Sequence, residues 1–416
     1  GITKYEWFID GLLADTGAVA HFTLQTGTYQ LKLVVSTSIA GFQDSITVPI
    51  SVYAVRKMLG GIIRGAIAQS GSMVYLTSTT RYVYAVDTLG NVQNTFQAVG
   101  YFISGVSITS AGNILAASED NKIYALTHQL QLIWNRSANI KIHSTPIEST
   151  DGQNTYIISY LGKVYAFNGQ NGNKQWVYQT AGEVNSSPIL LELQNGDKYL
   201  IFGRKGTSTD PASLIALKDC GDSAQVIWEI KTDGPISSSP AFYRNNDNSM
   251  IYFVTEKGTL YRAQWDGYRD TTWQVNTGDV VLNTSPVIDQ DGNVYIGSRQ
   301  GKLLVYEPNF NKMGHPIDSL IFSQAIVSTP SIGRNGKMYV NTSGGGIHSI
   351  NLRQKPLQAS LAFDTRSSVT APVLVTESGL VAAASNDGYL HYFVEPPLSG
   401  ISLPYRAVWP TFFCNY

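Results

Sequence analysis

The chain has 416 residues, of which 43% are hydrophobic and 14% charged, with 29 Lys and Arg against 30 Asp and Glu. The formal net charge of -1 provides no basic field for a phosphate backbone, so nucleic acid is not an expected partner. The sequence contains no apolar run of about eighteen residues and no positively charged apolar leader. We therefore expect no membrane span within this chain and an export signal that has already been removed.

The first part of the chain contains three segments that we predict to be strands. They are Trp7–Gly11, Gly27–Val35 and Ile46–Val52, each rich in β-branched or aromatic residues. Their order of Trp, Asp-Gly and Gly-x-Tyr resembles the polycystic-kidney-disease (PKD) module, an immunoglobulin-like β-sandwich, with Ile9 where that family usually has Gly. Immunoglobulin-type sandwiches run to about 100 residues. The resemblance thus implies a small β-sandwich, complete or truncated, over residues 1–55.

From residue 56 onward the chain is built from one repeated pattern. A Ser/Thr-x-Pro tripeptide recurs, and two weaker copies precede it; seven steps between residues 66 and 372 give a period of about 44 residues. The eight copies are Arg64–Ala66, Ser104–Val106, Ser144–Pro146, Ser186–Pro188, Ser238–Pro240, Thr284–Pro286, Ser328–Pro330 and Thr370–Pro372. A repeat of this length predicts a propeller, a solenoid or another repeat array rather than several unrelated domains.

Each repeat has the same internal order of strands and turns. A turn such as Asp291–Asn293 precedes a strand such as Val294–Gly297, and a second turn leads to a third strand. The clearest third strands are Lys122–Leu126, Lys163–Phe167, Lys302–Tyr306 and Tyr389–Phe393. Most repeats end with an aromatic residue, which we expect to fill the wedge between neighbouring units: Phe96, Trp134, Trp176, Trp228, Trp273, Phe363 and Trp409. The pattern predicts an all-β, eight-bladed β-propeller with four antiparallel strands per blade over residues 56–416.

The third repeat also carries a family resemblance. Gly162–Phe167 followed by Asn171–Trp176 resembles the pyrroloquinoline-quinone (PQQ-like) repeat, in which a turn, a Gly, a basic residue and a Trp follow the third strand. The resemblance extends over about residues 60–410. It implies an eight-bladed propeller like those of the quinoprotein alcohol dehydrogenases and of the outer-membrane assembly lipoprotein.

The residues that would support catalysis are missing from the pattern. Quinoprotein dehydrogenases use a vicinal disulfide and a calcium ion, yet this sequence has no adjacent cysteines and no acidic residue recurring at the tripeptides. We therefore expect neither PQQ nor calcium, and we assign no catalytic residue and no metal ligand. Asp289–Asn293 resembles a calcium loop but lacks its terminal Glu, which favours a hairpin turn. His348 and His391 occupy third-strand positions that hold Tyr elsewhere, which favours a packing role.

One position near the expected channel mouth breaks the repeat. The residue two before the repeat's Pro is Ser or Thr in seven repeats, because innermost strands crowd around the axis, but it is Arg64 in the first. The preceding position is apolar in four repeats and polar in four consecutive ones: His143, Asn185, Ser237 and Asn283. These four residues with Arg64 form our candidate site for an anionic or hydroxylated ligand. The alternative is a water-filled channel lined by polar groups.

We expect a non-catalytic, exported bacterial protein of the periplasm or cell surface, lipid-anchored or not, that binds protein or glycan partners at a propeller face. The alternative is an enzyme, either quinone-dependent or acting on carbohydrate. Cys220 and Cys414 have no metal-ligand spacing. We expect both thiols to be unpaired, with a long-range disulfide as the alternative.

Overall fold

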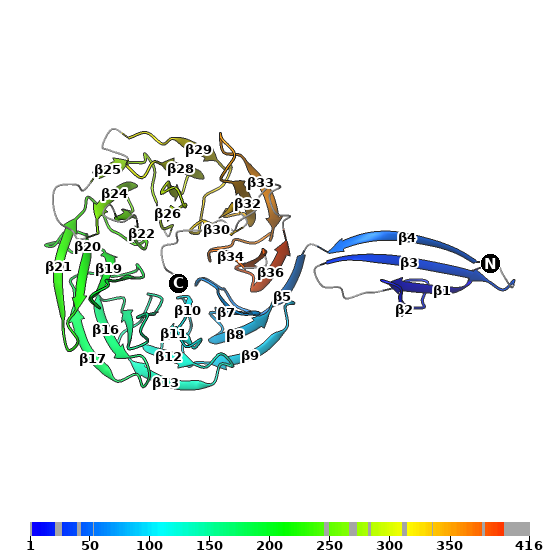
Figure 1. The fold of residues 1–416 in the computed structure, drawn as a ribbon, viewed down its shortest axis with the longest axis horizontal. Helices are drawn as coiled ribbons and strands as arrows, with labels where there is room; N and C mark the ends of the chain where they lie inside the picture. Colours follow the sequence, from blue (N-terminus) through cyan, green and yellow to red (C-terminus); the bar gives the residue numbers. More distant parts are fainter. Residues whose placement is uncertain are drawn as a thin grey trace.

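The computed structural model describes residues 2–20, 27–39, 43–52, 54–244, 249–265, 273–281, 284–309, 314–334, 336–376 and 379–394. Within these ranges the chain forms thirty-six strands and no helix. The strands form nine four-stranded sheets. One sheet comes from the N-terminal residues, and the other eight lie around a ring (Figure 1).

The N-terminal sheet has the strand order β2-β1-β3-β4 and is antiparallel. Its strands are β1 (Ile2–Ile9), β2 (Leu12–Asp15), β3 (Gly27–Thr37) and β4 (Gln43–Val52). Asp10 and Gly11 turn the chain between β1 and β2 with φ of 49° and 83°, so the predicted strand through Gly11 ends two residues early. The sandwich that the sequence predicts is not confirmed, since the described N-terminal residues form a single sheet with no second layer.

The ring repeats one arrangement, in which four consecutive strands form each of seven sheets. The first sheet consists of β6 (Ala68–Ser70), β7 (Met73–Thr77), β8 (Tyr82–Asp87) and β9 (Val92–Gln97), and the second of β10 (Val106–Ile108), β11 (Ile114–Ser118), β12 (Lys122–Leu126) and β13 (Leu132–Ser137). The third consists of β14 (Ile147–Glu148), β15 (Asn154–Ile158), β16 (Lys163–Asn168) and β17 (Lys174–Gln179). The fourth consists of β18 (Ile189–Glu192), β19 (Lys198–Arg204), β20 (Ser213–Asp219) and β21 (Ala224–Lys231).

The second half of the ring continues in the same way. Its sheets are β22 (Ala241–Tyr243), β23 (Met250–Val254), β24 (Thr259–Gln264) and β25 (Trp273–Asn276); β26 (Val287–Ile288), β27 (Val294–Gly297), β28 (Lys302–Tyr306) and β29 (Asp318–Ile321); β30 (Ser331–Ile332), β31 (Lys337–Asn341), β32 (Gly346–Asn351) and β33 (Ala359–Asp364); and β34 (Leu374–Val375), β35 (Leu380–Ala384) and β36 (Tyr389–Val394).

The last sheet takes its fourth strand from the beginning of the ring. β5 (Ala54–Met58) pairs antiparallel with β36, placing Met58 opposite Tyr389 and Ala54 opposite Phe393. The ring is thus closed by a strand that precedes the first repeat (Figure 1). The sequence pattern instead suggests Trp409 as the closing aromatic of the last repeat, a residue that lies outside the described part of the chain.

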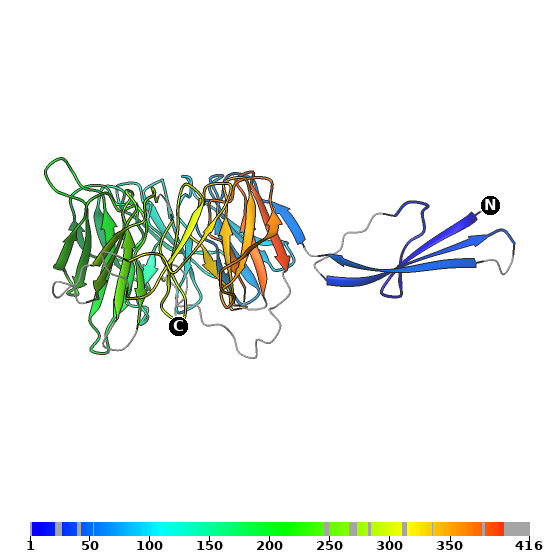
Figure 2. The same ribbon diagram turned by 90° about the horizontal axis from the view of Figure 1, so that it is seen from above.

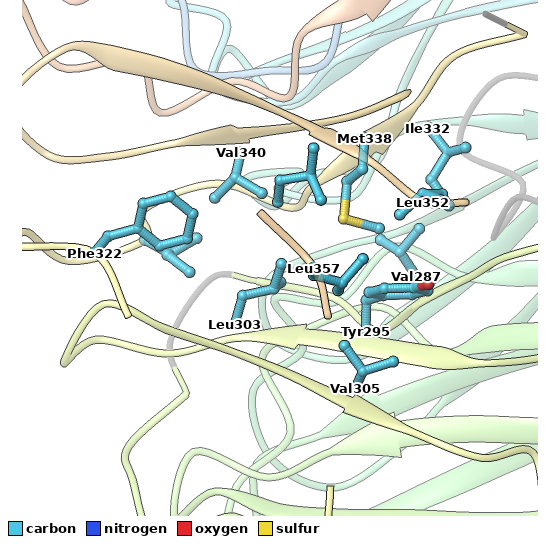
Figure 3. Close-up of a cluster of buried hydrophobic side chains, with 12 residues drawn as sticks. Val287, Tyr295, Leu303, Val305, Phe322, Ile332, Met338, Val340, Leu352 and Leu357 are labelled. Carbon is cyan, nitrogen blue, oxygen red and sulfur yellow. The ribbon is translucent and has the colours of Figure 1, made fainter. Parts of the chain in front are cut away.

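Apolar side chains fill every seam between neighbouring sheets. Eight clusters of buried residues are present in the described ranges, and each draws on two adjacent sheets of the ring. Figure 3 shows one of them, where Tyr295 and Leu303 face Met338 and Val340 of the next sheet. Because each sheet packs both of its faces against neighbours, its second and third strands are buried almost throughout.

Five of the seven predicted closing aromatics occupy these seams, including Phe96. Trp134 on β13 and Trp176 on β17 are buried in clusters shared with the following sheet. The indole N–H of Trp134 donates to the carbonyl of Gly169 at 3.1 Å, and that of Trp176 donates to Asp219 at 2.8 Å. A Cβ at Gly172 would lie 2.6 Å from the Trp134 ring, so the Gly of the repeat motif makes room for the preceding indole. Trp228 and Phe363 are partly buried in two further seams.

Candidate functional site

The Ser/Thr-x-Pro tripeptides lie at the inner ends of the sheets, and their first hydroxyl fixes the first strand to the second. Ser144 Oγ donates to the carbonyl of Ile158 at 2.9 Å, and Ser186 Oγ donates to that of Gly203 at 2.7 Å. Thr284 repeats the contact with Gly297 at 2.7 Å. These hydroxyls are therefore used by the fold itself, which explains why Ser or Thr, and not merely a small residue, recurs there.

The second residue of the tripeptide links one sheet to the next. Each backbone N–H at this position donates to the hydroxyl at the same position of the following sheet, over five consecutive steps at 2.9–3.3 Å. The residues in order are Gly105, Thr145, Ser187, Ser239, Ser285 and Thr329. We call this set the hydroxyl chain. It ends before Ala371, which has no hydroxyl, and it holds the inner ends of six sheets in register.

The structure brings together two of the five residues of the candidate site. His143 Nδ1 and Asn185 Oδ1 are 3.3 Å apart, and they come from adjacent sheets. Ser237 is half-buried and Arg64 is exposed. Asn283 lies outside the described residues. The ligand site therefore remains a prediction, of which the structure shows only that His143 and Asn185 lie in contact.

Two charged residues, Glu119 and Lys141, lie near His143, and the repeat pattern does not single out either of them. Glu119 Oε1 lies 3.6 Å from His143 Nε2 and 3.8 Å from Lys141 Nζ. The His143 ring packs on Tyr160, with centroids 4.7 Å apart. Glu119 and Tyr160 each follow the second strand of a sheet, while Lys141 and His143 precede a first strand. Antiparallel pairing puts these two kinds of loop at the same end of the sheets, which is why they meet.

The arrangement continues over the next two sheets. Lys205 Nζ lies 3.7 Å from Glu183 and 3.8 Å from Glu256, and a hydrogen bond to Glu183 raises the pKa of Tyr160. The backbone repeats as well: Tyr160 N–H donates to the Lys141 carbonyl and Lys205 N–H to the Glu183 carbonyl, both at 2.8 Å. We call the following residues the inner-loop cluster: Glu119, Lys141, His143, Tyr160, Glu183, Asn185, Lys205 and Glu256.

Exposed apolar side chains border the inner-loop cluster. Tyr101 is 55% exposed, and its carbonyl accepts the N–H of Glu119 at 2.8 Å. Leu161, directly after Tyr160, is 51% exposed, and Val99 is also exposed. The signal for this surface is present in the sequence, because a charged or aromatic residue follows the second strand in five consecutive sheets of the ring. Recognising it requires knowing which loops of neighbouring sheets meet.

Local structure explains three places that could suggest catalysis or metal binding: Ser385 with His391, the turn at Asp289, and His348. Ser385 Oγ contacts both His391 Nε2, at 2.8 Å, and Asp387, so the carboxylate approaches the Ser rather than the imidazole. His391 is buried on β36, and burial lowers its pKa to about 4. Asp289 accepts the N–H groups of Asp291 and Asn293 and the hydroxyl of Tyr295, all at 2.9 Å, as a hairpin turn requires. His348 packs on Phe322, with ring centroids 4.8 Å apart.

Within the described ranges, no three His, Cys, Asp or Glu side chains gather as a metal-binding group. A helix long and apolar enough to cross a membrane is likewise not found in that part of the chain. Cys220 is exposed, and Cys414 lies beyond the described residues.

Comparison with known proteins agrees with the propeller fold. Residues 59–213 match the family model described as "Outer membrane protein assembly factor BamB", which covers less than half of the chain. A search of curated proteins finds no match.

Among solved structures, BamB from Moraxella catarrhalis is similar with 16% identity and a TM-score of 0.63, over 83% of this chain and all of that one. Sqt1 of Saccharomyces cerevisiae gives 13% identity and a TM-score of 0.69, again over 83% of this chain and all of Sqt1. The C-terminal WD40 domain of Sif2 gives 12% and 0.61, with 83% of this chain and all of that domain covered. At these identities the likeness shows the fold alone: the chain contains a β-propeller.

Proposed function

We propose that this chain is a non-catalytic scaffold whose propeller binds a protein partner through the inner-loop cluster and its apolar border. One observation carries the proposal: charged side chains form a continuous band over four neighbouring sheets, and Tyr101 and Leu161 are exposed beside it. Aromatic anchors surrounded by polar groups are typical of protein interfaces. His143 and Asn185 belong to this surface, and the proposed binding requires neither PQQ nor calcium.

The match to the family model supports a protein partner and an exported location. Its description names an assembly factor of the outer membrane, which is consistent with a periplasmic protein that holds other proteins together. We accordingly place this chain in the periplasm or at the cell surface of a bacterium. Cell fractionation with an antibody tests the location, and recovery from the cytoplasm would contradict it.

Site-specific photo-crosslinking tests the binding surface. A photoreactive amino acid at Leu161 should crosslink the full-length protein in cells to a discrete protein partner, identified by mass spectrometry. Leu361, on the outer strand β33 and 60% exposed, is the matched control and should give no such product. Equal crosslinking from both positions, or from neither, would contradict this surface. Binding on a glycan array that is lost in Tyr101→Ala would favour the glycan alternative.

A further inference from the structure

The N-terminal sheet has one strongly apolar face. Register places Trp7 opposite Leu33, and Leu33 opposite Ile46, so these three residues lie on the same face. Since side chains alternate along a strand, the residues two positions away share that face. We call the following residues the sheet-face patch: Tyr5, Trp7, Ile9, Leu31, Leu33, Val35 and Ile46. The opposite face is more polar, with Glu6, Lys32 and Thr47.

No described side chain of β1 to β4 is buried. Ile46 is 60% exposed, and Trp7 is half-buried with its indole N–H donating to the Gly17 carbonyl at 2.8 Å. Figures 1 and 2 show the sheet beside the ring rather than stacked on it, so the ring of the same chain leaves the patch open. A sheet with one apolar face is stable when a second layer covers that face.

We propose that the second layer is the N-terminal sheet of another copy of this chain, packed face to face across a two-fold axis. The four strands have 33 residues in total, which at about 3.3 Å per residue and a strand spacing of about 4.8 Å give a footprint of roughly 520 Å² per copy. Two copies therefore bury about 1,000 Å² in total, which is about the minimum for a specific interface.

The charges on this face are compatible with two-fold pairing. The patch itself contains no Lys or Arg, so no cations meet across the interface. Two carboxylates share this face: Asp44 lies opposite Val35 at one end of the patch, and Asp15 lies opposite Trp7 on the edge strand β2, where it accepts the N–H groups of Thr16 and Gly17. An antiparallel arrangement of the two sheets places the two Asp44 carboxylates at opposite ends, where both stay in water. The dimer would be a sandwich of two sheets, the packing by which such faces are usually covered.

Sedimentation velocity on the full-length chain over a concentration series tests this proposal. We expect twice the subunit mass of 45.4 kDa at high concentration. Ile46→Lys should weaken dimerisation at least about tenfold. Thr47→Lys is the matched control, because Thr47 is the next residue on β4, is exposed and lies on the opposite face; this variant should dimerise as the wild type does.

Two results would overturn the proposal. One is a monomer throughout the series for the wild type, which would mean that another segment or another protein covers the patch. The other is a dimer that survives Ile46→Lys with unchanged affinity. Calorimetry of the ring's unfolding transition shows whether each variant is folded. Since the patch and the inner-loop cluster share no residues, crosslinking at Leu161 is expected to be the same in the Ile46→Lys protein.

Discussion

The ring and the N-terminal sheet are made of the same kind of unit, yet only the ring has a core. Both consist of four antiparallel strands with β-branched and aromatic residues. In the ring each sheet is buried by the next, and every seam has its own cluster. The N-terminal sheet is paired just as regularly, but none of its described side chains is buried. Strand pairing alone therefore does not produce a core; a neighbouring layer does.

The largest expected difference between the two regions appears when one tryptophan is removed from each. Trp176→Ala deletes a buried indole from a seam, together with its hydrogen bond to Asp219. It should reduce the free energy of unfolding by about 3–5 kcal/mol. Trp7→Ala should leave the ring's transition unchanged, because Trp7 is half-buried and contributes to no seam. Denaturant melts followed by far-UV circular dichroism measure both.

A loss below about 1 kcal/mol for Trp176→Ala would contradict the packing role. A comparable loss from Trp7→Ala would show that the sheet and the ring unfold as one unit. Trp134→Phe is a useful control, since it keeps an aromatic ring in an equivalent seam while removing the indole N–H.

The second prediction concerns His391 on β36, the strand that pairs with β5 to close the ring. Burial lowers the pKa of His391 to about 4, whereas an unperturbed His has a pKa of about 6.5. The groups near it are Ser385, whose Oγ contacts His391 Nε2, Arg56 on β5, Asp387 and the Phe363 ring on β33. Between these two pKa values the unfolded chain binds a proton that the folded chain does not. Stability should therefore fall by about 2 kcal/mol as the pH drops from 7 to 5.

His391→Tyr isolates this contribution, because Tyr124 and Tyr261 occupy the corresponding third-strand positions of other sheets. The variant should lose the part of the pH slope that lies between pH 7 and 5. Melting curves at a series of pH values make the comparison, and an unchanged slope would exclude His391 as its source. Exposed pairs in the N-terminal sheet, such as Lys4 and Glu6, should contribute little to that slope.

The two regions also differ in how well the sequence predicts them. Several strands of the ring agree residue for residue, such as Lys122–Leu126, Val294–Gly297 and Lys302–Tyr306. Repetition explains this, since a turn or an aromatic that recurs in most of the eight repeats identifies its own position. The N-terminal segment occurs once, so nothing in it distinguishes a sandwich from a single sheet.

Contacts between distant parts of the chain were the hardest to predict. β5 has no aromatic and no tripeptide, so its pairing with β36 leaves no mark in the sequence. The inner-loop cluster depends on which loops of adjacent sheets meet, as Glu119 and Lys141 do. The repeat revealed His143 and Asn185 because they depart from a column of apolar residues, but it could not show which charges approach them.

A third prediction tests the hydroxyl chain. Ser187→Ala removes the acceptor of the Thr145 N–H, which lies 2.9 Å away in a buried position. Leaving this donor unsatisfied should cost about 1–2 kcal/mol of stability. Ser45→Ala, on an exposed position of β4, should change stability by less than about 0.5 kcal/mol. Ser187→Thr keeps the hydroxyl acceptor and should retain most of the stability that Ser187→Ala loses. Equal stability of Ser187→Ala and wild type would show that the hydroxyl chain does not stabilise the ring.

The smallest effect is expected at Arg64. This residue belongs to the ring but is exposed, so it tests whether burial, rather than membership of the ring, decides stability. Arg64 stands where other repeats have the Ser or Thr that joins the first two strands, but its side chain is exposed. Arg64→Ala should therefore change the free energy of unfolding by less than about 0.5 kcal/mol. A loss above about 1 kcal/mol would show that the guanidinium makes a structural contact near the axis. Calorimetric titration of both proteins with a sugar acid then tests its other expected role, because unchanged affinity in Arg64→Ala would remove Arg64 from the candidate site.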